Sequence, residues 1–368
     1  MKHDWEYKKL KNVCRKGSSN IQQNKIVGID GEYPVYGASG YVQNVDFYHQ
    51  EHPYIGIVKD GSGVGRVNKY PAKSSLLGTM QYILPNEGMS LGYLMYCLQS
   101  LKLSKFASGA AIPHIYFRDY GECSVPVPAL AVQERIVGEL DKVREIIEKK
   151  KQQVKELDSL AQSIFYDMFG DPVENEKGWE VKKFGEVGEL IRGGGFLKSD
   201  FVESGVPCIH YGQIHMKFGQ FIKEHLTEIP ASVAAKSKIA SKGDVVIAIT
   251  SEDVEGSCKC TAWMGDYDIF VGAHAAIYKH NQNPIYVSYY IKSSGFQIAK
   301  QKYVHGIKVM EIKPSDISKI DILLPPLSLQ QAFAEKVEAI EKQKELITAS
   351  LKEAERLFDT RMEYWFGE

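Results

Sequence analysis

The sequence predicts a mixed α/β (α+β) protein with two globular domains, each followed by a long helix. Three observations lead to this fold class: the chain repeats itself, each repeat ends in a heptad pattern, and the rest consists of short strand patterns separated by turns. With 368 residues, 44% of them hydrophobic and 25% charged, the chain is long enough for two ordinary domains. This composition excludes a disordered or collagen-like chain.

The internal repeat determines the domain organisation. Trp-Glu-Tyr-Lys-Lys-Leu at 5–10 reappears as Trp-Glu-Val-Lys-Lys-Phe at 179–184, 174 residues later. Residues 109–115 match 306–312, and the motif Pro-x-Leu-x-x-Gln at 128–133 recurs at 325–330, both 197 residues later. The second copy therefore contains about 23 extra residues. We predict four segments: a first domain over 1–129, a helix over 130–170, a second domain over 171–326 and a helix over 327–368.

Both helical segments carry residues spaced alternately by four and three, which is the a/d seam of a coiled coil. The seam residues are Ile136, Leu140, Val143, Ile147, Lys150, Val154, Leu157, Ala161, Ile164 and Met168, then Phe333, Val337, Ile340, Lys344, Ile347, Leu351, Ala354, Phe358, Arg361 and Trp365. Two such stripes in one chain most simply bury each other; alternatively, each helix packs on its own domain. The seam lysines Lys150 and Lys344 either fix the register or extend to solvent.

Outside the helices, short apolar and β-branched runs predict strands. These runs lie at 54–58, 81–84, 123–127, 245–250, 276–278 and 320–324, and two short helices are expected at 91–98 and 287–291. Glycine and asparagine mark the turns between them. Each copy is thus a mixed α/β unit that leads into a long helix.

Charge and motifs exclude several classes of protein. The 45 basic and 46 acidic residues exclude a protein that coats nucleic acid through its net charge. No run is apolar enough to span a membrane and no leader pattern opens the chain, so we expect a cytoplasmic protein that does not contact membranes. The six cysteines contain no Cys-x-x-Cys pair, which predicts reduced thiols and no metal site. We find no catalytic motif and predict no catalytic residue.

Glycine-rich and polar loops are the candidate binding elements. The loop Asp-Gly-Ser-Gly-Val-Gly-Arg at 60–66 follows a strand but fits neither phosphate-binding glycine motif. Its three glycines could bring free backbone N–H groups close to DNA phosphate; the alternative is a plain hairpin turn. Its counterpart at 250–256 is acidic. The 21 tyrosines and many glycine turns suggest a surface for specific polar recognition.

Loop residues that hydrogen-bond or stack on bases form the candidate DNA contacts. They are Gly37, Ser39, Lys59, Ser62, Gly63, Arg66, Ser108 and His114 in the first copy, and Arg192, His210, Tyr211, Gln213, Ser251, Lys259, His305 and Lys308 in the second.

The chain resembles the specificity subunits of type I restriction-modification systems. The resemblance rests on Pro-x-Leu-x-x-Gln at the start of each helix and on Met-Phe-Gly-Asp-Pro at 168–172, which leads into the second Trp-Glu-Val-Lys. It covers essentially the whole chain. It implies that each domain is a target recognition domain for one half of a split double-stranded DNA sequence. The helices would form an antiparallel coiled coil, with internal pseudo-twofold symmetry, that sets the spacer.

The resemblance also implies partners and their cofactors. Two methyltransferase subunits, which use S-adenosylmethionine, would dock on the helices, and restriction (translocase) subunits would use ATP with Mg²⁺. The chain itself would be non-catalytic. Because residues of about 12–105 and 190–300 differ between the copies, the two half-sites should differ. The alternatives are a stand-alone DNA-binding or antirestriction protein, or a fused DNA methyltransferase. The latter would need an Asn/Asp-Pro-Pro-Tyr motif, which the sequence lacks.

Overall fold

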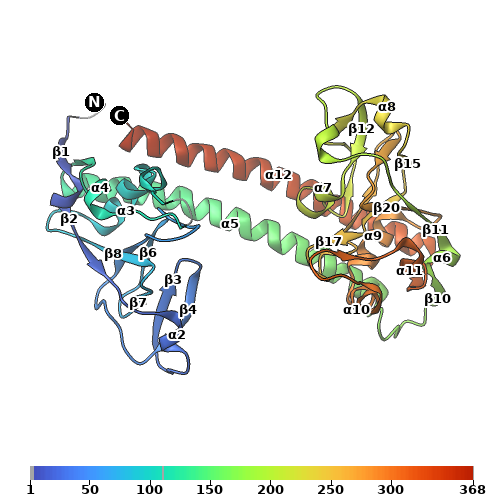
Figure 1. Cartoon of the computed structure of the whole chain (residues 1–368), viewed down its shortest axis with the longest axis horizontal. Coiled ribbons are helices and arrows are strands. Elements are labelled where there is room, and N and C mark those ends of the chain that lie inside the picture. The colour runs from blue at the N-terminus through green and yellow to red at the C-terminus, as the bar shows by residue number, and fades with distance from the viewer. Residues whose placement is uncertain (1–3, 110–111, 368) are drawn as a thin grey trace. The chain divides into compact units, whose positions relative to one another are not determined.

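The computed structural model describes residues 4–109 and 112–367, and its element order is drawn in Figure 1. Two residues of the first repeat, Ala110 and Ala111, lie outside the described residues. The chain divides into two compact units. Unit 1 comprises Met1–Gln152 and Thr348–Glu368, and unit 2 comprises Gln153–Ile347. Each long helix contributes residues to both units, so these units divide the chain differently from the four predicted segments.

Unit 1 is built around an antiparallel four-stranded sheet with the order β2-β8-β5-β6. A three-stranded sheet, β4-β3-β7, and a two-stranded ladder, β1-β9, complete the strands. The strands are β1 (Glu6–Lys9), β2 (Cys14–Ser18), β3 (Tyr33–Gly37), β4 (Gly40–Val45), β5 (Tyr54–Val58), β6 (Val67–Tyr70), β7 (Ser75–Leu76), β8 (Met80–Pro85) and β9 (Ser124–Val127). The shorter helices are α1 (Leu10–Val13), α2 (Gln23–Ile26), α3 (Leu91–Ser100), η1 (Leu103–Phe106) and α4 (Phe117–Tyr120).

Unit 2 repeats this plan with the five-stranded order β11-β20-β16-β18-β13, beside the sheet β14-β12-β19-β15 and the ladders β10-β22 and β17-β21. Its strands are β10 (Glu180–Lys183), β11 (Gly188–Arg192), β12 (Val206–Ile209), β13 (Phe221–Ile222), β14 (Thr227–Ile229), β15 (Lys238–Ala240), β16 (Val245–Ala248), β17 (Thr250–Ser251), β18 (Cys260–Trp263), β19 (Ile269–Val271), β20 (Ala275–His280), β21 (Met310–Glu311) and β22 (Asp321–Leu324). Its shorter helices are α6 (Phe184–Val187), η2 (Lys198–Asp200), α7 (Tyr211–Met216), α8 (Ala231–Ala234), α9 (Pro284–Lys292), α10 (Ser294–Lys300), η3 (Gln301–Tyr303) and α11 (Pro314–Ile317).

The two units share one topology, which confirms the predicted fold class. β11, β20, β16 and β18 correspond in order and direction to β2, β8, β5 and β6, and β12 pairs in parallel with β19 as β3 does with β7. Most of the extra length of the second copy lies between β12 and β14. There, residues 210–226 form α7 and β13, whereas residues 38 and 39 alone join β3 to β4.

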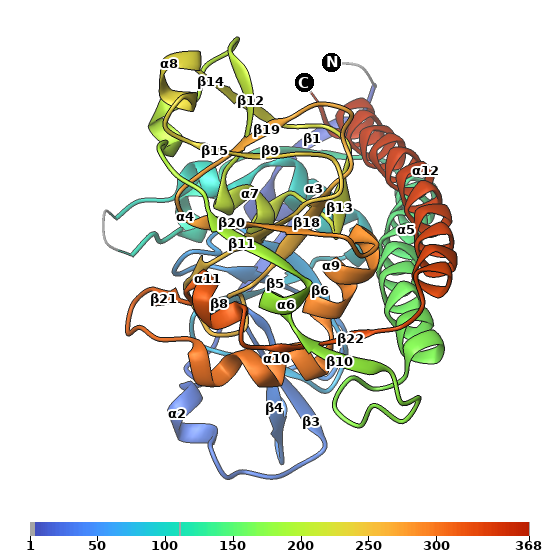
Figure 2. The ribbon, with the colours of Figure 1, turned by 90° about the vertical axis from the view of Figure 1, so that its right-hand side faces the viewer.

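The long helices are α5 (Leu130–Phe169) and α12 (Leu327–Phe366), each of 40 residues. In unit 1, ion pairs join Glu139 to Arg361 and Lys151 to Glu355, so the helices are antiparallel. In unit 2, Lys344 donates to Asp158 over 2.6 Å. The two helices lie side by side in both views (Figure 1 and Figure 2).

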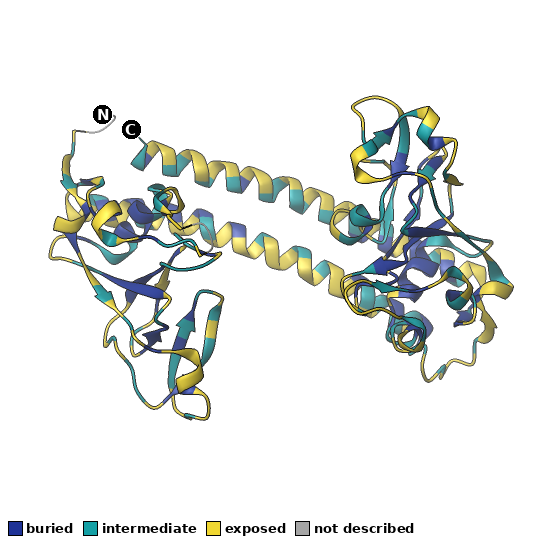
Figure 3. Ribbon diagram, viewed as in Figure 1, coloured by how far each residue is buried: buried dark blue, intermediate teal, exposed yellow. Residues whose placement is uncertain are grey.

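Every predicted seam residue is buried or half-buried, while the opposite faces of the helices are exposed (Figure 3). In unit 1, Val143, Ile147 and Ala354 pack together with Leu351 and Phe358. The alternative packing also contributes, because each helix begins against its own domain: Ile136 and Leu140 join the core of unit 1, and Phe333 and Val337 join the core of unit 2.

The repeated Pro-x-Leu-x-x-Gln motif ends in a buried glutamine that ties each long helix to its domain. Gln133 is fully buried, and its amide accepts from the backbone N–H of Ser90 and donates to the carbonyls of Gly88 and Pro128. Gln330 repeats this arrangement. Its amide accepts from the N–H of Asn283 and donates to the carbonyl of Pro325 and to the side chain of Gln282. In both units the glutamine holds the residue that precedes α3 or α9, so the motif is a structural lock between two helix starts.

Candidate nucleic-acid interface

Unit 1 gathers its candidate residues on one set of loops, which we call rim 1: residues 19–23, 36–42, 59–66, 77–79, 108–109 and 112–116. Backbone hydrogen bonds join these segments one to the next. Leu77 N–H donates to Tyr36 O, Gly78 N–H to Ile21 O, Lys59 N–H to Thr79 O and Gly61 N–H to Pro113 O. All eight first-copy candidates therefore lie on one rim, although up to 77 residues separate them in the sequence.

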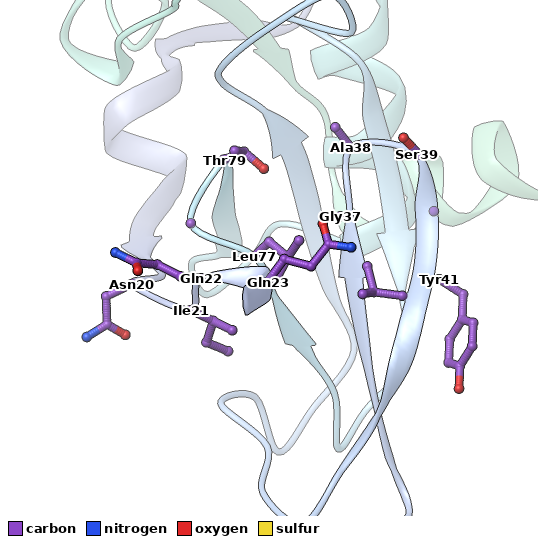
Figure 4. A pocket seen from close by; sticks show the side chains of 13 residues that line it. Asn20, Ile21, Gln22, Gln23, Gly37, Ala38, Ser39, Tyr41, Leu77 and Thr79 are labelled. Atoms are coloured by element: carbon purple, nitrogen blue, oxygen red, sulfur yellow. The ribbon is translucent and has the colours of Figure 1, made fainter. Parts of the chain in front are cut away.

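A pocket of about 720 Å³ opens within rim 1. Figure 4 shows the amide side chains of Asn20, Gln22 and Gln23 around it, together with Ser39 and Thr79. The three amides were not among the predicted contacts. They follow β2 in the polar run Ser-Ser-Asn-Ile-Gln-Gln-Asn at 18–24, and this run is the signal that could have identified them, because amides pair with adenine edges.

The glycine loop at 60–66 is a hairpin connection between the paired strands β5 and β6. The expectation of free N–H groups is wrong for five of its residues: Asp60, Gly61, Val64, Gly65 and Arg66 all donate to backbone carbonyls. The Arg66 side chain also donates to the carbonyl of Gly63, and a Cβ on Gly63 would lie 2.0 Å from the guanidinium. The glycines thus serve the turn, and Ser62 and Arg66 are the predicted contacts in this loop whose side chains are exposed.

A cluster of aromatic and charged side chains lies at one side of rim 1. His114 Nδ1 contacts the carboxylate of Asp60, and both side chains are about one-quarter exposed. The His114 ring lies 4.1 Å from that of Tyr116, and the Arg118 guanidinium lies 4.6 Å from the Tyr116 ring centroid. Ser108 pairs with His114 through two backbone hydrogen bonds. The predicted contacts Ser108 and His114 are therefore neighbours.

Rim 2 occupies the equivalent position in unit 2: residues 192–195, 209–215, 249–259, 272–275 and 305–311. Its segments are also joined by backbone hydrogen bonds, from Gly193 N–H to Ala275 O, from Gly272 N–H to Ile209 O and from Ile249 N–H to His274 O. His305 and Glu311 form the same backbone pair as Ser108 and His114. All eight second-copy candidates lie on this rim.

Arg192 and Gln213 already have partners within rim 2. The Arg192 guanidinium pairs with Glu311 at 2.9 Å and donates to the carbonyl of Ala273. The Gln213 amide accepts from the backbone N–H of His210 and donates to the Thr227 hydroxyl. These bonds fix the start of α7, so Gln213 serves the loop as well as being a predicted DNA contact.

Histidine and tyrosine rings line the centre of rim 2. Burial lowers the pKa of His210, which keeps its ring neutral near pH 7, and its Nδ1 accepts from Gly212 N–H. The Tyr211 ring lies 5.0 Å from His274 and 6.0 Å from His215, while His215 Nε2 contacts Thr250 O at 2.9 Å. His215 and His274 were not predicted, because nothing in the sequence distinguishes them from the other histidines.

Lysine side chains lie at the outer edge of rim 2. Lys259 corresponds to Arg66: each ends its loop, and its carbonyl accepts from the backbone of the preceding strand. Lys308 is exposed, as is the neighbouring His305.

Within residues 4–109 and 112–367, no group of three or more His, Cys, Asp or Glu could hold a metal ion. None of the described helices is both long and apolar enough to cross a membrane.

The family model for the type I restriction modification DNA specificity domain matches residues 2–157 and 176–356. The chain belongs to this family. The two matched ranges correspond to the two copies of the repeat, which confirms the resemblance seen in the sequence. DNA target recognition is therefore the general function of this specificity-family chain.

Two relatives resemble the chain in sequence, and one solved structure resembles it in fold. The chain is 25% identical to the type I restriction enzyme MjaVIII specificity subunit of Methanocaldococcus jannaschii, over 81% of this chain and 74% of the relative. It is 22% identical to a putative type I restriction enzyme specificity subunit of Haemophilus influenzae, over 92% and 87%. A crystal structure of an S subunit from M. genitalium shares the fold with a TM-score of 0.59 at 14% identity, over 99% of this chain and 96% of that one.

Proposed function

We propose that each unit of this specificity-family chain reads one half of a bipartite, asymmetric DNA target through its rim. The observation that carries the proposal is that the two rims use equivalent backbone segments but different side chains. Rim 1 presents the amides of Asn20, Gln22 and Gln23, whereas rim 2 presents Arg192, His210 and an acidic loop. Amides pair with adenine and arginine with guanine, so different rims should select different bases.

The helices would set the spacer between the half-sites and dock two methyltransferase subunits. Exposed leucines at equivalent positions of the two helices support two similar docking sites, one for each methyltransferase subunit. Leu130 and Leu327 are 48% and 56% exposed, and Leu160 and Leu357 are 46% and 49% exposed. Each pair is separated by the repeat offset of 197 residues. Exposed leucines at matched positions suit two copies of one partner.

The chemistry would then come from the partners. S-adenosylmethionine would be bound by the methyltransferase subunits, and ATP with Mg²⁺ by the restriction subunits. This chain would contribute recognition alone, in keeping with its lack of a catalytic motif.

Methylation mapping tests this proposal. Methylated adenines are mapped in the host genome with the gene, without it, and with Asn20, Gln22 and Gln23 all changed to alanine. We expect a split motif that vanishes without the gene, and a triple variant that relaxes one half only, since each lost base contact costs about 1–3 kcal/mol. The control is Gln153→Ala, an exposed glutamine of α5.

Three outcomes would contradict the proposal. A motif that persists without the gene would assign its recognition to another protein. Methyl transfer by the purified chain alone would indicate a fused enzyme. Specific DNA binding with no effect on methylation would indicate a stand-alone binding protein.

A further inference from the structure

A lysine with almost no exposure lies beneath the acidic loop of rim 2. Lys300, the last residue of α10, is 1% exposed. Its Nζ donates to the carbonyls of Glu255 at 3.0 Å and Ser257 at 2.5 Å. Lysine is rarely buried this completely unless it is paired. Here the acceptors are two carbonyls of a single loop, residues 251–259.

Burial of Lys300 has an energetic cost that the loop carbonyls offset. Burial lowers the pKa of Lys300, while the nearby Cys258, Asp253, Glu255 and Cys260 oppose that shift. A buried ammonium without its acceptors would be strongly destabilising. The loop and the lysine are therefore coupled: displacing the carbonyls leaves the charge unsatisfied.

The loop itself is tightly folded over this charge. Asp253 accepts from Gly256 N–H at 2.5 Å, and the Ser257 hydroxyl donates to Val254 O at 2.7 Å. A Cβ on Gly256 would lie 2.2 Å from the Ser251 hydroxyl. Cys258 adopts a φ of 63°, in the left-handed region. The hydrogen bonds inside the loop and those from Lys300 thus fix a single backbone conformation.

The conformation of the loop determines where its exposed acidic side chains lie, and therefore how they would meet DNA. Glu252, Asp253 and Glu255 are exposed there, and the predicted contacts Ser251 and Lys259 lie at its two ends. Carboxylates repel phosphate but accept hydrogen bonds from the exocyclic amino group of cytosine. A small displacement of these side chains would therefore exchange a favourable base contact for repulsion.

We propose that Lys300 is a positioning residue for specificity: it holds the loop 251–259 in the shape that reads the second half-site, without touching DNA itself. The inference rests on the proposed function of rim 2. It predicts that the loss of the Lys300 ammonium changes discrimination in one half of the target only.

The test uses the complex of this chain with its methyltransferase subunits and compares wild type with Lys300→Met. Binding is measured for the mapped target and for single base-pair changes in each half. We expect discrimination in the second half to fall at least about tenfold, the size of one base contact, and discrimination in the first half to stay unchanged. The methylation rate at saturating DNA should also be unchanged, because Lys300 acts on recognition.

Lys292→Met is the matched control. Lys292 lines the same pocket of about 800 Å³ as Lys300 but is exposed, with its Nζ 5.8 Å from the Tyr289 ring centroid. It should leave both half-sites as in wild type. Gly256→Ala perturbs the loop while keeping the lysine, and it should reproduce the loss in the second half even where Lys300→Met does not fold.

The inference is overturned if folded Lys300→Met, or Gly256→Ala, discriminates both halves as well as wild type. Equal losses in both halves would also overturn it, since they would indicate general destabilisation. These results differ from a failure of the proposed function, in which the wild-type complex itself would not recognise a split target.

Discussion

Two buried glutamines show how single side chains determine where the long helices begin. Each glutamine accepts from the backbone N–H of the residue that precedes the facing helix, Ser90 for Gln133 and Asn283 for Gln330. Each also donates to the carbonyl of the proline that opens its own Pro-x-Leu-x-x-Gln motif. Their partners Ser90 and Asn283 lie 43 and 47 residues earlier in the chain. The sequence identified the motif as the start of each helix, but its role could not be predicted because these partners are distant.

Replacing either glutamine by leucine should destabilise the protein strongly. Gln133→Leu or Gln330→Leu leaves a buried N–H and at least one buried carbonyl without partners, which costs about 2–4 kcal/mol. Urea unfolding measures the loss. Gln153→Leu, at an exposed position of α5, should stay within about 0.5 kcal/mol of wild type. A loss below about 0.5 kcal/mol in both buried variants would show that the motif does not act as a lock.

At the scale of elements, the a/d periodicity of α5 and α12 predicted the structure well, because every seam residue is buried or half-buried. Of the two interpretations of the seam lysines, the structure supports register for Lys344, which donates to Asp158 on the other helix and to Glu341. Burial alone would lower the pKa of Lys344, but these two hydrogen bonds raise it overall. Lys150 lines a groove of about 420 Å³ with Ser350 and Glu353.

A matched pair of substitutions tests the helix pairing in unit 1. Ile147 is 7% exposed in the seam, whereas Ile146, its neighbour on the same helix, is 46% exposed. Ile147→Asp places an unpaired carboxylate against Ala354 and Leu351 and should cost about 4 kcal/mol. Ile146→Asp should cost less than about 1 kcal/mol. Urea unfolding followed by helix circular dichroism compares them; equal losses would contradict the seam.

The rims were only partly predictable, for a physical reason. Strong apolar strands such as β5 and β16 were found from their sequence, because burial on both faces gives continuous apolar runs. The strands β3 and β4 were missed because they are not continuously apolar. The strand β7, of two residues, and the helix α7 were missed because they are brief, and β7 pairs with β3, about 40 residues earlier in the chain. The candidate residues therefore lie on the loops of the two rims, but the amides of Asn20, Gln22 and Gln23 were not among the predicted contacts.

At the scale of the whole molecule, the tyrosines divide between the core and the surface. Ten of the 21 tyrosines are buried, so the expectation that tyrosines mark a recognition surface fails for those ten. They include Tyr93, Tyr96 and Tyr120 in unit 1 and Tyr278, Tyr286 and Tyr290 in unit 2. Their hydroxyls reach partners inside each unit, as Tyr120 does with Gln81 and Tyr286 with the carbonyl of Leu323. Buried aromatic rings with satisfied hydroxyls give both units large apolar contacts.

These tyrosines make the stability of the molecule sensitive to alkaline pH. Burial raises the pKa of Tyr93, Tyr120, Tyr278 and Tyr286 above the value of about 10 that an unfolded tyrosine has. A raised pKa in the folded state means that the unfolded chain releases its protons first as the pH rises. The stabilisation is therefore complete below pH 10 and is lost above it.

Buried thiols also lower the stability of the fold as the pH rises, whereas Lys300 raises it. All six cysteines are free, and burial raises the pKa of Cys14 and of Cys258 to about 12, so their stabilisation begins to fall near pH 9. The pKa of Lys300 is lowered, so its deprotonation favours the folded state as the pH rises towards 10. One lysine cannot offset the many tyrosines and thiols.

We therefore expect the free energy of unfolding to decline from about pH 9 and to fall steeply above about pH 10, by about 1.4 kcal/mol per pH unit for each tyrosine that ionises only on unfolding. Tyrosinate absorbance at 295 nm, followed against pH in buffer and in guanidinium, measures this. In guanidinium the tyrosines should titrate together near pH 10, whereas in buffer a fraction should stay protonated and then ionise abruptly as the units unfold. If the two curves coincide while circular dichroism still reports folded protein, the buried tyrosines are not shielded and the predicted alkaline instability is wrong.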